Sequence, residues 1–381
     1  DMTLAFAKGL GGSTNVYTGV TFKLPQSAVD KWQVKDINLA DLNPRMDKYY
    51  AENGAHFETE ANINRNNQLF KQGCENLGWQ VEQFAINTRH CAGLSTCNLG
   101  CPRSAKQGTA VVQIPKAERR GVEVITNCHV NKIISDSAHN INLQATITQH
   151  SEDQNLLAGD YIIEARKVVV SAGAINTPAL LMRSFGEDFH PMIGRYLTCH
   201  PALIMAAEHP EPVKGTQGPP KNYYSEHFSQ EKGFLLESCM YFPFSFARNL
   251  TGFGEEVDSF IERYPYLQMV LALVLDKAHA HNRVTIDKQG LPQVHYTIDE
   301  TIRQSFVTAI RASAELMFSA GAERLHAPSS KEFFIYAEQQ AELAELITLD
   351  RFKLGQITIS SAHLMGGCRM GDSREQGVTD S

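Results

Sequence analysis

The chain has 381 residues, of which 43% are hydrophobic and 20% charged, and its formal net charge is -7. This length is enough for one large domain or two ordinary ones, each with a sizeable core. The mild acidic excess provides no general attraction to nucleic acid or anionic lipid, so we expect neither as a partner. No apolar run reaches membrane-spanning length, and the longest, 267–275, is predicted to be a buried strand.

Cysteine usage indicates free thiols in a reducing compartment, and we expect a cytoplasmic location. Eight cysteines in 381 residues are too few for a disulfide scaffold, and no secretory signal is visible at the N-terminus. Only Cys91, Cys97 and Cys101 cluster, in a C-x5-C-x3-C loop that begins at His90. Such a loop could hold a metal or an iron–sulfur cluster, but this spacing favours a structural loop with free or paired thiols. We predict no metal site.

The N-terminal part contains a glycine turn at Gly11, Gly12 and Ser13. Bare backbone N–H groups in such a turn can face an anion or a ring system, although an ordinary tight turn would have the same sequence. A short strand is predicted over 20–24, where apolar residues alternate. Residues 26–88 are predicted to be mainly helical, with one amphipathic helix that ends near Gly78.

The middle of the chain contains the clearest local unit, at 167–182. It combines an apolar run predicted as a strand (167–170), a turn of small residues (171–174) and an apolar helix that begins near Thr177 and Pro178. Doubly wound sheets hold ligands at such strand–turn–helix junctions, but a turn without a ligand is equally compatible. Before this unit we predict a helix over 110–119 and strands over 122–125, 129–134 and 161–164.

The second half of the chain is predicted to be an α+β domain. A Pro- and Gly-rich segment at 210–220 reads as a lid or linker. Strands follow from Gly233, including a hairpin that pairs 283–287 with 293–297. A long amphipathic helix then runs from about Glu300 to just before Gly321.

The segment around His363 near the C-terminus is the best candidate for chemistry. A short strand over 356–361 precedes it, and the adjacent glycines Gly366 and Gly367 would let a backbone or a flat ligand approach closely. The pKa of histidine suits proton transfer near neutral pH. A packed histidine with no chemical role is the alternative.

Three segments in this order resemble the glucose–methanol–choline (GMC) oxidoreductases, a family of flavoproteins. They are Gly11-Gly-Ser, Val168-Val-Val-Ser-Ala-Gly-Ala-Ile-Asn-Thr-Pro and His363-x-x-Gly-x-Cys-Arg-Met-Gly. The cysteine loop followed by Lys106-Gln-Gly is most similar to the long-chain and general alcohol oxidase or dehydrogenase branch. The resemblance covers about residues 8–381.

The resemblance implies the fold class and its division along the chain. We expect an α/β FAD-binding domain, Rossmann-like but incomplete, and an α+β substrate domain with an antiparallel sheet. The expected parts are an FAD-contacting loop and strand (1–25), a helical and Cys-rich region (26–108), a portion of the FAD-binding domain (109–205), the substrate-binding domain (206–355) and an active-site segment that returns to the FAD domain (356–381).

The resemblance also implies site residues. The glycine turn, with Gly11, Gly12, Ser13 and Asn15, would lie against the flavin and pyrophosphate of FAD. Val130 would contact the adenine through its backbone. The small-residue turn, with Ser171, Ala172 and Gly173, would lie by the dinucleotide half of FAD. His363 matches the first active-site histidine and would be the catalytic base.

The implied reaction is oxidation of the CH–OH group of a small-molecule alcohol to a carbonyl, with hydride transfer to FAD and oxygen, a quinone or a cytochrome as electron acceptor. Two features depart from the family: the chain has no G-x-G-x-x-G fingerprint, and it stops at Ser381, before the family's second catalytic His or Asn. We therefore interpret it as an internal piece of a longer flavoenzyme. The alternatives are an iron–sulfur dehydrogenase subunit that passes electrons to a cytochrome, and a non-catalytic fragment without FAD.

Overall fold

The structure is a computed structural model that describes residues 2–32, 34–135, 140–152, 155–329, 331 and 333–380. Its helices are α1 (Gln26–Trp32), α2 (Leu39–Asn53), α3 (Arg65–Asn76), α4 (Gln113–Glu118), α5 (Gly173–Phe185), α6 (Pro243–Ala247), α7 (Glu255–Glu262), α8 (Glu300–Ser319) and α9 (Leu343–Leu346). Its strands are β1 (Met2–Leu4), β2 (Val20–Thr21), β3 (Ala55–His56), β4 (Glu82–Gln83), β5 (Ala85–Asn87), β6 (Cys128–Ser135), β7 (Ile141–Ile147), β8 (Gly159–Ala165), β9 (Ala202–Glu208), β10 (Tyr223–Ser225), β11 (Phe234–Ser238), β12 (Leu267–Val274), β13 (Arg283–Ile286), β14 (Pro292–His295), β15 (Arg324–His326), β16 (Phe334–Tyr336) and β17 (Ile359–Ser361).

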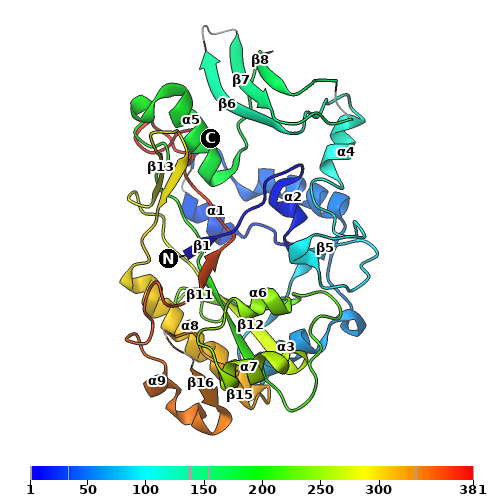
Figure 1. Ribbon diagram of the computed structural model, residues 1–381, viewed down its shortest axis with the longest axis vertical. Coiled ribbons are helices and arrows are strands. Elements are labelled where there is room, and N and C mark those ends of the chain that lie inside the picture. The colour runs from blue at the N-terminus through cyan, green and yellow to red at the C-terminus, as the bar shows by residue number, and fades with distance from the viewer. Residues whose placement is uncertain are drawn as a thin grey trace.

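A largely antiparallel sheet organises the lower half of the molecule in Figure 1. Its strands lie in the order β1-β17-β9-β12-β11-β10-β4, and β15 and β16 extend it beside β9. β1 and β17 form a parallel pair, whereas β12 runs antiparallel to both β9 and β11. Every residue of β12 is buried because both faces of the sheet are covered. The predicted buried strand and the antiparallel sheet are confirmed.

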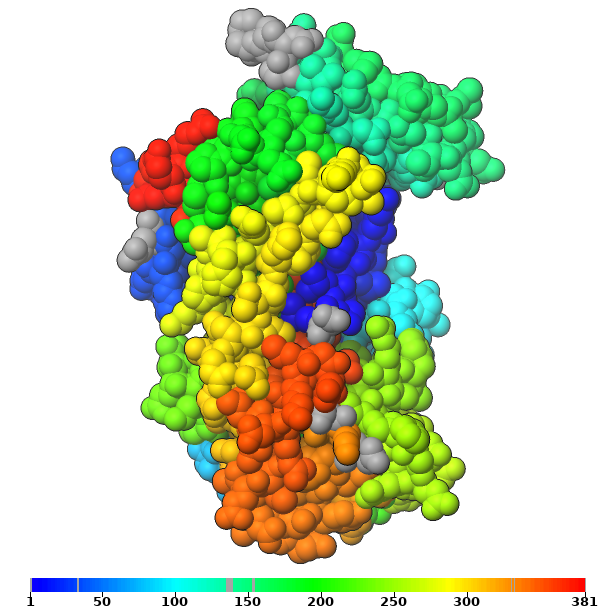
Figure 2. Space-filling model, turned by 60° about the vertical axis from the view of Figure 1, so that its left-hand side comes forward, coloured from blue at the N-terminus to red at the C-terminus, as the bar shows by residue number. Residues whose placement is uncertain are grey.

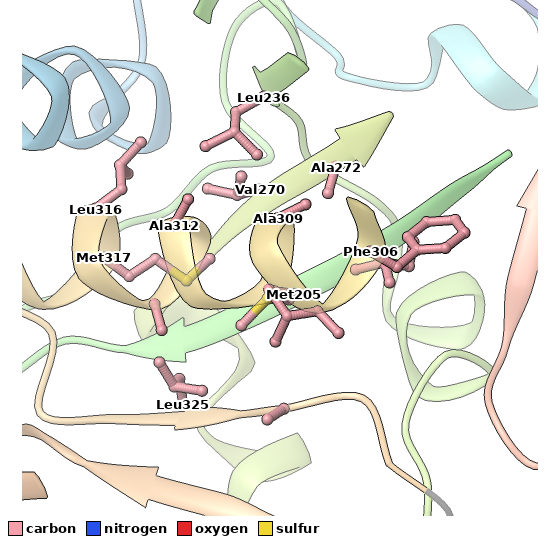
Figure 3. Close-up of a cluster of buried hydrophobic side chains, with 14 of the residues drawn as sticks. Met205, Leu236, Val270, Ala272, Phe306, Ala309, Ala312, Leu316, Met317 and Leu325 are labelled. Atoms are coloured by element: carbon pink, nitrogen blue, oxygen red, sulfur yellow. The ribbon is translucent and has the colours of Figure 1, made fainter. Parts of the chain in front are cut away.

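Helices α3 and α8 cover one face of this sheet and form the main core (Figure 3). The Asp299 side chain caps α8 by accepting a hydrogen bond from the Ile302 N–H at 2.9 Å. The apolar stripe of α8, which includes Phe306 and Met317, packs against Met205 and Val270 of the sheet. This stripe is the one that the sequence predicts, and the helix ends two residues before Gly321.

The opposite face of the sheet is covered by α6 and α7. Phe246 and Phe260, one from each helix, are fully buried and pack with Leu267, Met269 and Leu271 of β12. Residues of β12 therefore alternate between two separate cores, as the two-residue repeat of a strand requires. Strand β12 is thus packed against helices on both of its faces.

A three-stranded sheet of β6, β7 and β8 forms the top of the molecule and projects from it (Figures 1 and 2). Helix α5 packs against β6, and the Ile133 N–H donates to Ser184 Oγ at 2.9 Å across that contact. The predicted strands at 129–134 and 161–164 are confirmed within β6 and β8. The mixture of α/β and antiparallel parts is the predicted fold class.

The predicted strand at 167–170 is wrong. These residues leave β8 and continue without sheet partners among the described residues, and Val169 is 88% exposed. A strand is defined by the neighbours that take up its N–H and C=O groups, so an apolar run alone does not form one. The helix of the same unit is confirmed, but its predicted start is wrong: α5 begins at Gly173, four residues before Thr177, so that Pro178 lies inside the helix. The predicted strand at 122–125 is also absent, and the 20–24 strand is limited to β2.

The segment after β17 passes through a narrow space that only glycine fits. Met365 pairs with Thr198 through two backbone hydrogen bonds of 2.9 and 3.0 Å. A Cβ on Gly366 would lie 2.1 Å from the carbonyl oxygen of Tyr196, and one on Gly367 would lie 2.6 Å from that of Ala174. Both glycines have φ near +90°, at 92° and 78°. The predicted close backbone approach at this glycine pair is confirmed.

A left-handed backbone alone costs a residue with a side chain about 1–3 kcal/mol. Gly366→Ala is expected to lower the free energy of unfolding by more than this amount. The added methyl group meets backbone, which cannot move aside cheaply. Chemical denaturation measures the loss. Gly121→Ala is the matched control, since Gly121 has a φ of 86° and open space around its Cβ position. Equal losses in the two variants would contradict the steric argument.

Candidate active site

A groove of about 810 Å³ lies between α5 and the segment that follows His363. Its walls come from residues distant in sequence: Val170, Ser171, Gly173, Ala174, Thr177, Leu181, Phe189, His190, Ile193, Leu364, Met365, Gly366, Cys368, Val378 and Thr379. The three residues immediately after His363 thus share a groove with the small-residue turn at the start of α5. This volume is within the range of small-molecule and cofactor sites.

The start of α5 is open toward this groove. Gly173 has a φ of 86°, and no atom lies within 4 Å of the position that a Cβ would occupy there. The Ala172 N–H donates to Thr177 Oγ1 at 3.0 Å, which fixes the turn. Helix N-termini carry partial positive charge and free N–H groups, so a groove beside one can accept an anionic group.

The other predicted cofactor residues are not among those that line the groove. The turn at 11–15 packs on the chain at 108–110: a Cβ on Gly11 would lie 2.6 Å from that of Ala110. Ser13 Oγ accepts a hydrogen bond from the Ala7 N–H, and Asn15 Nδ2 donates to the Leu10 carbonyl at 2.7 Å. Gly12 has open space around its Cβ position. Val130 lies in β6 opposite Ala145, next to a shift in register.

Lys106 fixes the N-terminal turn, a role that sequence reasoning missed. Its side chain is buried and donates to the carbonyl oxygens of Asn15, Tyr17 and Cys97 at 2.9, 2.6 and 2.7 Å. Burial lowers the pKa of Lys106. One ammonium group thus joins the glycine turn to the cysteine loop. In the sequence, the role of Lys106 is indicated only by its place between the cysteine loop and a glycine, and this place does not specify which carbonyl groups the lysine binds.

The cysteine loop holds free thiols in contrasting environments. Burial raises the pKa of Cys97 to about 11. Burial also acts to raise the pKa of Cys101, but hydrogen bonds from the backbone of Lys106, Arg103 and Ala105 outweigh it, so that pKa is lowered. Among the described residues, no three or more His, Cys, Asp or Glu side chains are arranged to hold a metal ion. The three thiols therefore do not form a ready cluster site in this geometry.

His363 lies beside a second imidazole, that of His200, and their ring centroids are 5.2 Å apart. The His363 residue is exposed to solvent over part of its surface. The protein around its ring nevertheless lowers the pKa of His363 to about 4, first by desolvation and second by repulsion from His200. Sequence reasoning did not select His200, because a lone His-Pro pair carries no recognisable pattern. Only the pairing of two distant backbone segments brings the rings together.

A buried ion pair lies near the two histidines. Lys221 and Glu237 contact each other through their side chains and are 8% and 6% exposed. Both act electrostatically on both imidazoles, Glu237 raising and Lys221 lowering the histidine pKa values. Because the two charges are paired, their effects on each ring oppose one another. The neighbourhood of His363 is therefore polar but close to neutral.

Comparison with known proteins places this chain in a family. The GMC oxidoreductase models match residues 1–202 and 278–381. A GMC-type oxidoreductase of Mycobacterium tuberculosis is 28% identical over 325 residues, which are 84% of this chain and 50% of the relative. A long-chain-alcohol oxidase of Arabidopsis thaliana is 24% identical over 409 residues, 100% of this chain and 53% of the relative. The chain thus spans about half the length of the curated relatives it matches.

A solved structure of Aspergillus oryzae formate oxidase shares the fold, with a TM-score of 0.65 and 13% sequence identity over 97% of this chain and 76% of that one. The chain belongs to the GMC oxidoreductase family. FAD is the cofactor of this flavoprotein class, as predicted. In the described part of the chain, no helix has both the length and the apolar character needed to cross a membrane.

Lys106→Met is expected to lower the free energy of unfolding by about 3 kcal/mol, because three carbonyl oxygens lose a charged donor. Thermal or urea unfolding measures the change. Lys23→Met is the control: its ion pair with Asp47 is solvent-exposed, so the loss should be much smaller. Similar losses in both variants would contradict the structural role of Lys106.

Proposed function

We propose that this chain forms the alcohol-oxidising site of an FAD-dependent oxidoreductase, with His363 as the base. One observation carries the proposal: the residues directly after His363 line the same groove as the turn at the start of α5. The candidate base therefore adjoins, in the chain, residues that line the candidate cofactor site. Family membership supports the flavin chemistry, and the names of the Arabidopsis relatives support an alcohol as substrate.

The groove fits a flat, partly anionic cofactor. It is lined by small residues at one end, Ser171, Gly173 and Ala174, and opens next to the α5 N-terminus. These residues would hold FAD, together with backbone around Gly366. Gly11, Gly12, Ser13, Asn15 and Val130 remain proposed contacts for other parts of FAD. When bound, FAD supplies the hydride acceptor for the oxidised carbon.

His363 is suited to accept a proton. Because its pKa lies near 4, the imidazole is neutral at pH 7 and has a free nitrogen lone pair. An alcohol whose hydroxyl donates to that nitrogen gains alkoxide character, which favours loss of hydride from its carbon. His363 then holds the proton while the carbonyl product forms.

The substrate class we propose is a small-molecule alcohol, oxidised to the aldehyde or ketone. The relatives' names favour a long-chain alcohol and oxygen as the acceptor. A quinone or a cytochrome is the other acceptor to test. An iron–sulfur route to a cytochrome would require a set of cluster ligands, and in the described part of the chain no three His, Cys, Asp or Glu side chains are arranged to hold a metal ion.

His363→Ala should leave FAD bound but slow anaerobic reduction of the flavin by a primary alcohol at least about a hundredfold, the usual range for losing a general base. Stopped-flow absorbance of the flavin-loaded protein measures the rate. His295→Ala is the control, because His295 is exposed on the β13–β14 hairpin, away from the groove residues, and its ring hydrogen-bonds to the Thr285 hydroxyl. A His363→Ala protein that is reduced at the parental rate would exclude this residue as the base.

Ser171→Trp should reduce the flavin content per chain at least about tenfold, because the indole would fill the groove beside Gly173. Ser171→Ala adds no bulk and should keep the parental content. Flavin absorbance of purified protein gives the ratio. If Ser171→Trp retains a full complement of flavin, the cofactor lies elsewhere.

A further inference from the structure

His200 and His363 lie opposite each other on two segments that pair as antiparallel chains. Thr198 and Met365 exchange both backbone hydrogen bonds, and the Ser361 hydroxyl donates to the Cys199 carbonyl. His200 comes two residues after Thr198, and His363 comes two residues before Met365. Antiparallel pairing therefore sets the two imidazoles against each other, in agreement with their centroid distance of 5.2 Å.

The pairing is irregular at the two histidines. Beyond them, Ser360 rather than Ser361 pairs with Ala202, so the register shifts by one residue. His200 has a φ of 50°, in the left-handed region that residues with a side chain rarely adopt. Irregularities of this kind redirect side chains and are frequent beside active sites.

A carboxylate holds the strained backbone of His200 in place. The N–H groups of Cys199 and His200 both donate to Asp276, at 2.8 and 2.9 Å. The Tyr296 hydroxyl donates to the same carboxylate at 2.7 Å. These three donors fix the position of Asp276 and, through it, the direction of the His200 side chain.

His200 reduces the stability of the fold in two ways. Its backbone is strained, and its buried Nε2 atom finds no hydrogen-bond partner among the described residues. The ring that it contacts belongs to the candidate base. A residue that is unfavourable to stability and is fixed against a reactive group is a candidate for function.

We propose that His200 is a positioning residue for His363: the two rings form a two-imidazole site that carries at most one proton. This inference rests on the proposed function of His363. His200 fixes the orientation of the His363 ring and opposes protonation of that ring by solvent before the alcohol binds. The single proton that the pair then holds is the one taken from the alcohol. The charged groups that face the pair are Glu237, Lys221 and Asp276.

The electrostatics agree with this arrangement. Burial lowers the pKa of His200, while Glu237 and Asp276 raise it and Lys221 lowers it. For His363, repulsion from His200 adds to desolvation. Removing the His200 ring removes one cause of the low pKa of His363, so that pKa should rise. Lys221 and Glu237 remain paired in either case.

His200→Asn is the variant that tests the proposal, because asparagine tolerates a left-handed backbone better than other residues with a side chain. We expect the pKa of His363 to rise by at least half a pH unit, measured by NMR titration of isotope-labelled histidine in the flavin-bound protein without substrate. His363→Gln identifies the resonance. The acidic limb of kcat/KM should move to higher pH by the same amount, and flavin reduction at neutral pH should slow about tenfold.

His200→Gly serves as the stability control. Glycine relieves the backbone strain and removes the unpartnered nitrogen, so Tm should equal or exceed that of the parent while the pH shift persists. A structural role alone would lower Tm and slow the reaction equally at every pH, which would overturn the proposal. Unchanged NMR and kinetic titrations in both variants would also overturn it.

The His363→Gln protein separates this inference from the proposed function. If that protein is reduced by alcohol at the parental rate, the base assignment fails and the role of His200 fails with it. If it is inactive while His200→Asn retains the parental pH profile, only the inference about His200 is wrong.

Discussion

The pairing of residues 198–202 with residues 360–365 is the contact on which the site depends. It adds β17 to the edge of β9 and continues past the sheet through the Thr198–Met365 bridge. Gly194 and Gly367 are also joined, with the Gly194 N–H donating to the Gly367 carbonyl at 2.7 Å. Without this pairing, His363, the α5 turn and His200 would lie on unrelated parts of the surface.

The lower sheet gives this pairing a rigid support. β9 is held on its other side by β12, which is buried between two cores. A loop that carries a reactive histidine can be positioned accurately when it leaves such a strand directly. The groove, by contrast, is bordered by α5 and by Val170, which has no sheet partner among the described residues. The candidate base is therefore on the rigid side of the site and the proposed cofactor contacts are on the open side.

Charge around the candidate base is balanced rather than absent. Glu237 and Lys221 pair with each other in a buried position, and Asp276 is satisfied by Cys199, His200 and the hydroxyl of Tyr296. A neutral imidazole needs such surroundings, because an unpaired carboxylate nearby would favour its protonated form. The low pKa of His363 follows from desolvation by the surrounding protein and from a second imidazole, while the opposing effects of Glu237 and Lys221 offset each other.

The sequence by itself determined the elements whose signals are local. The stripe of α8, the buried run of β12 and the need for glycine at 366 and 367 can all be read from neighbouring residues, and the motifs at 11–13, 168–178 and 363–371 indicate the family. Tertiary structure alone decided which residues and elements those elements contact. The run at 167–170 has no strand partners among the described residues, Lys106 finds three carbonyl groups from two separate loops, and His200 meets His363 from 163 positions away. Hydrogen-bond partners and buried neighbours come from distant parts of the chain. A local residue pattern does not identify them, because they become neighbours only when the chain folds.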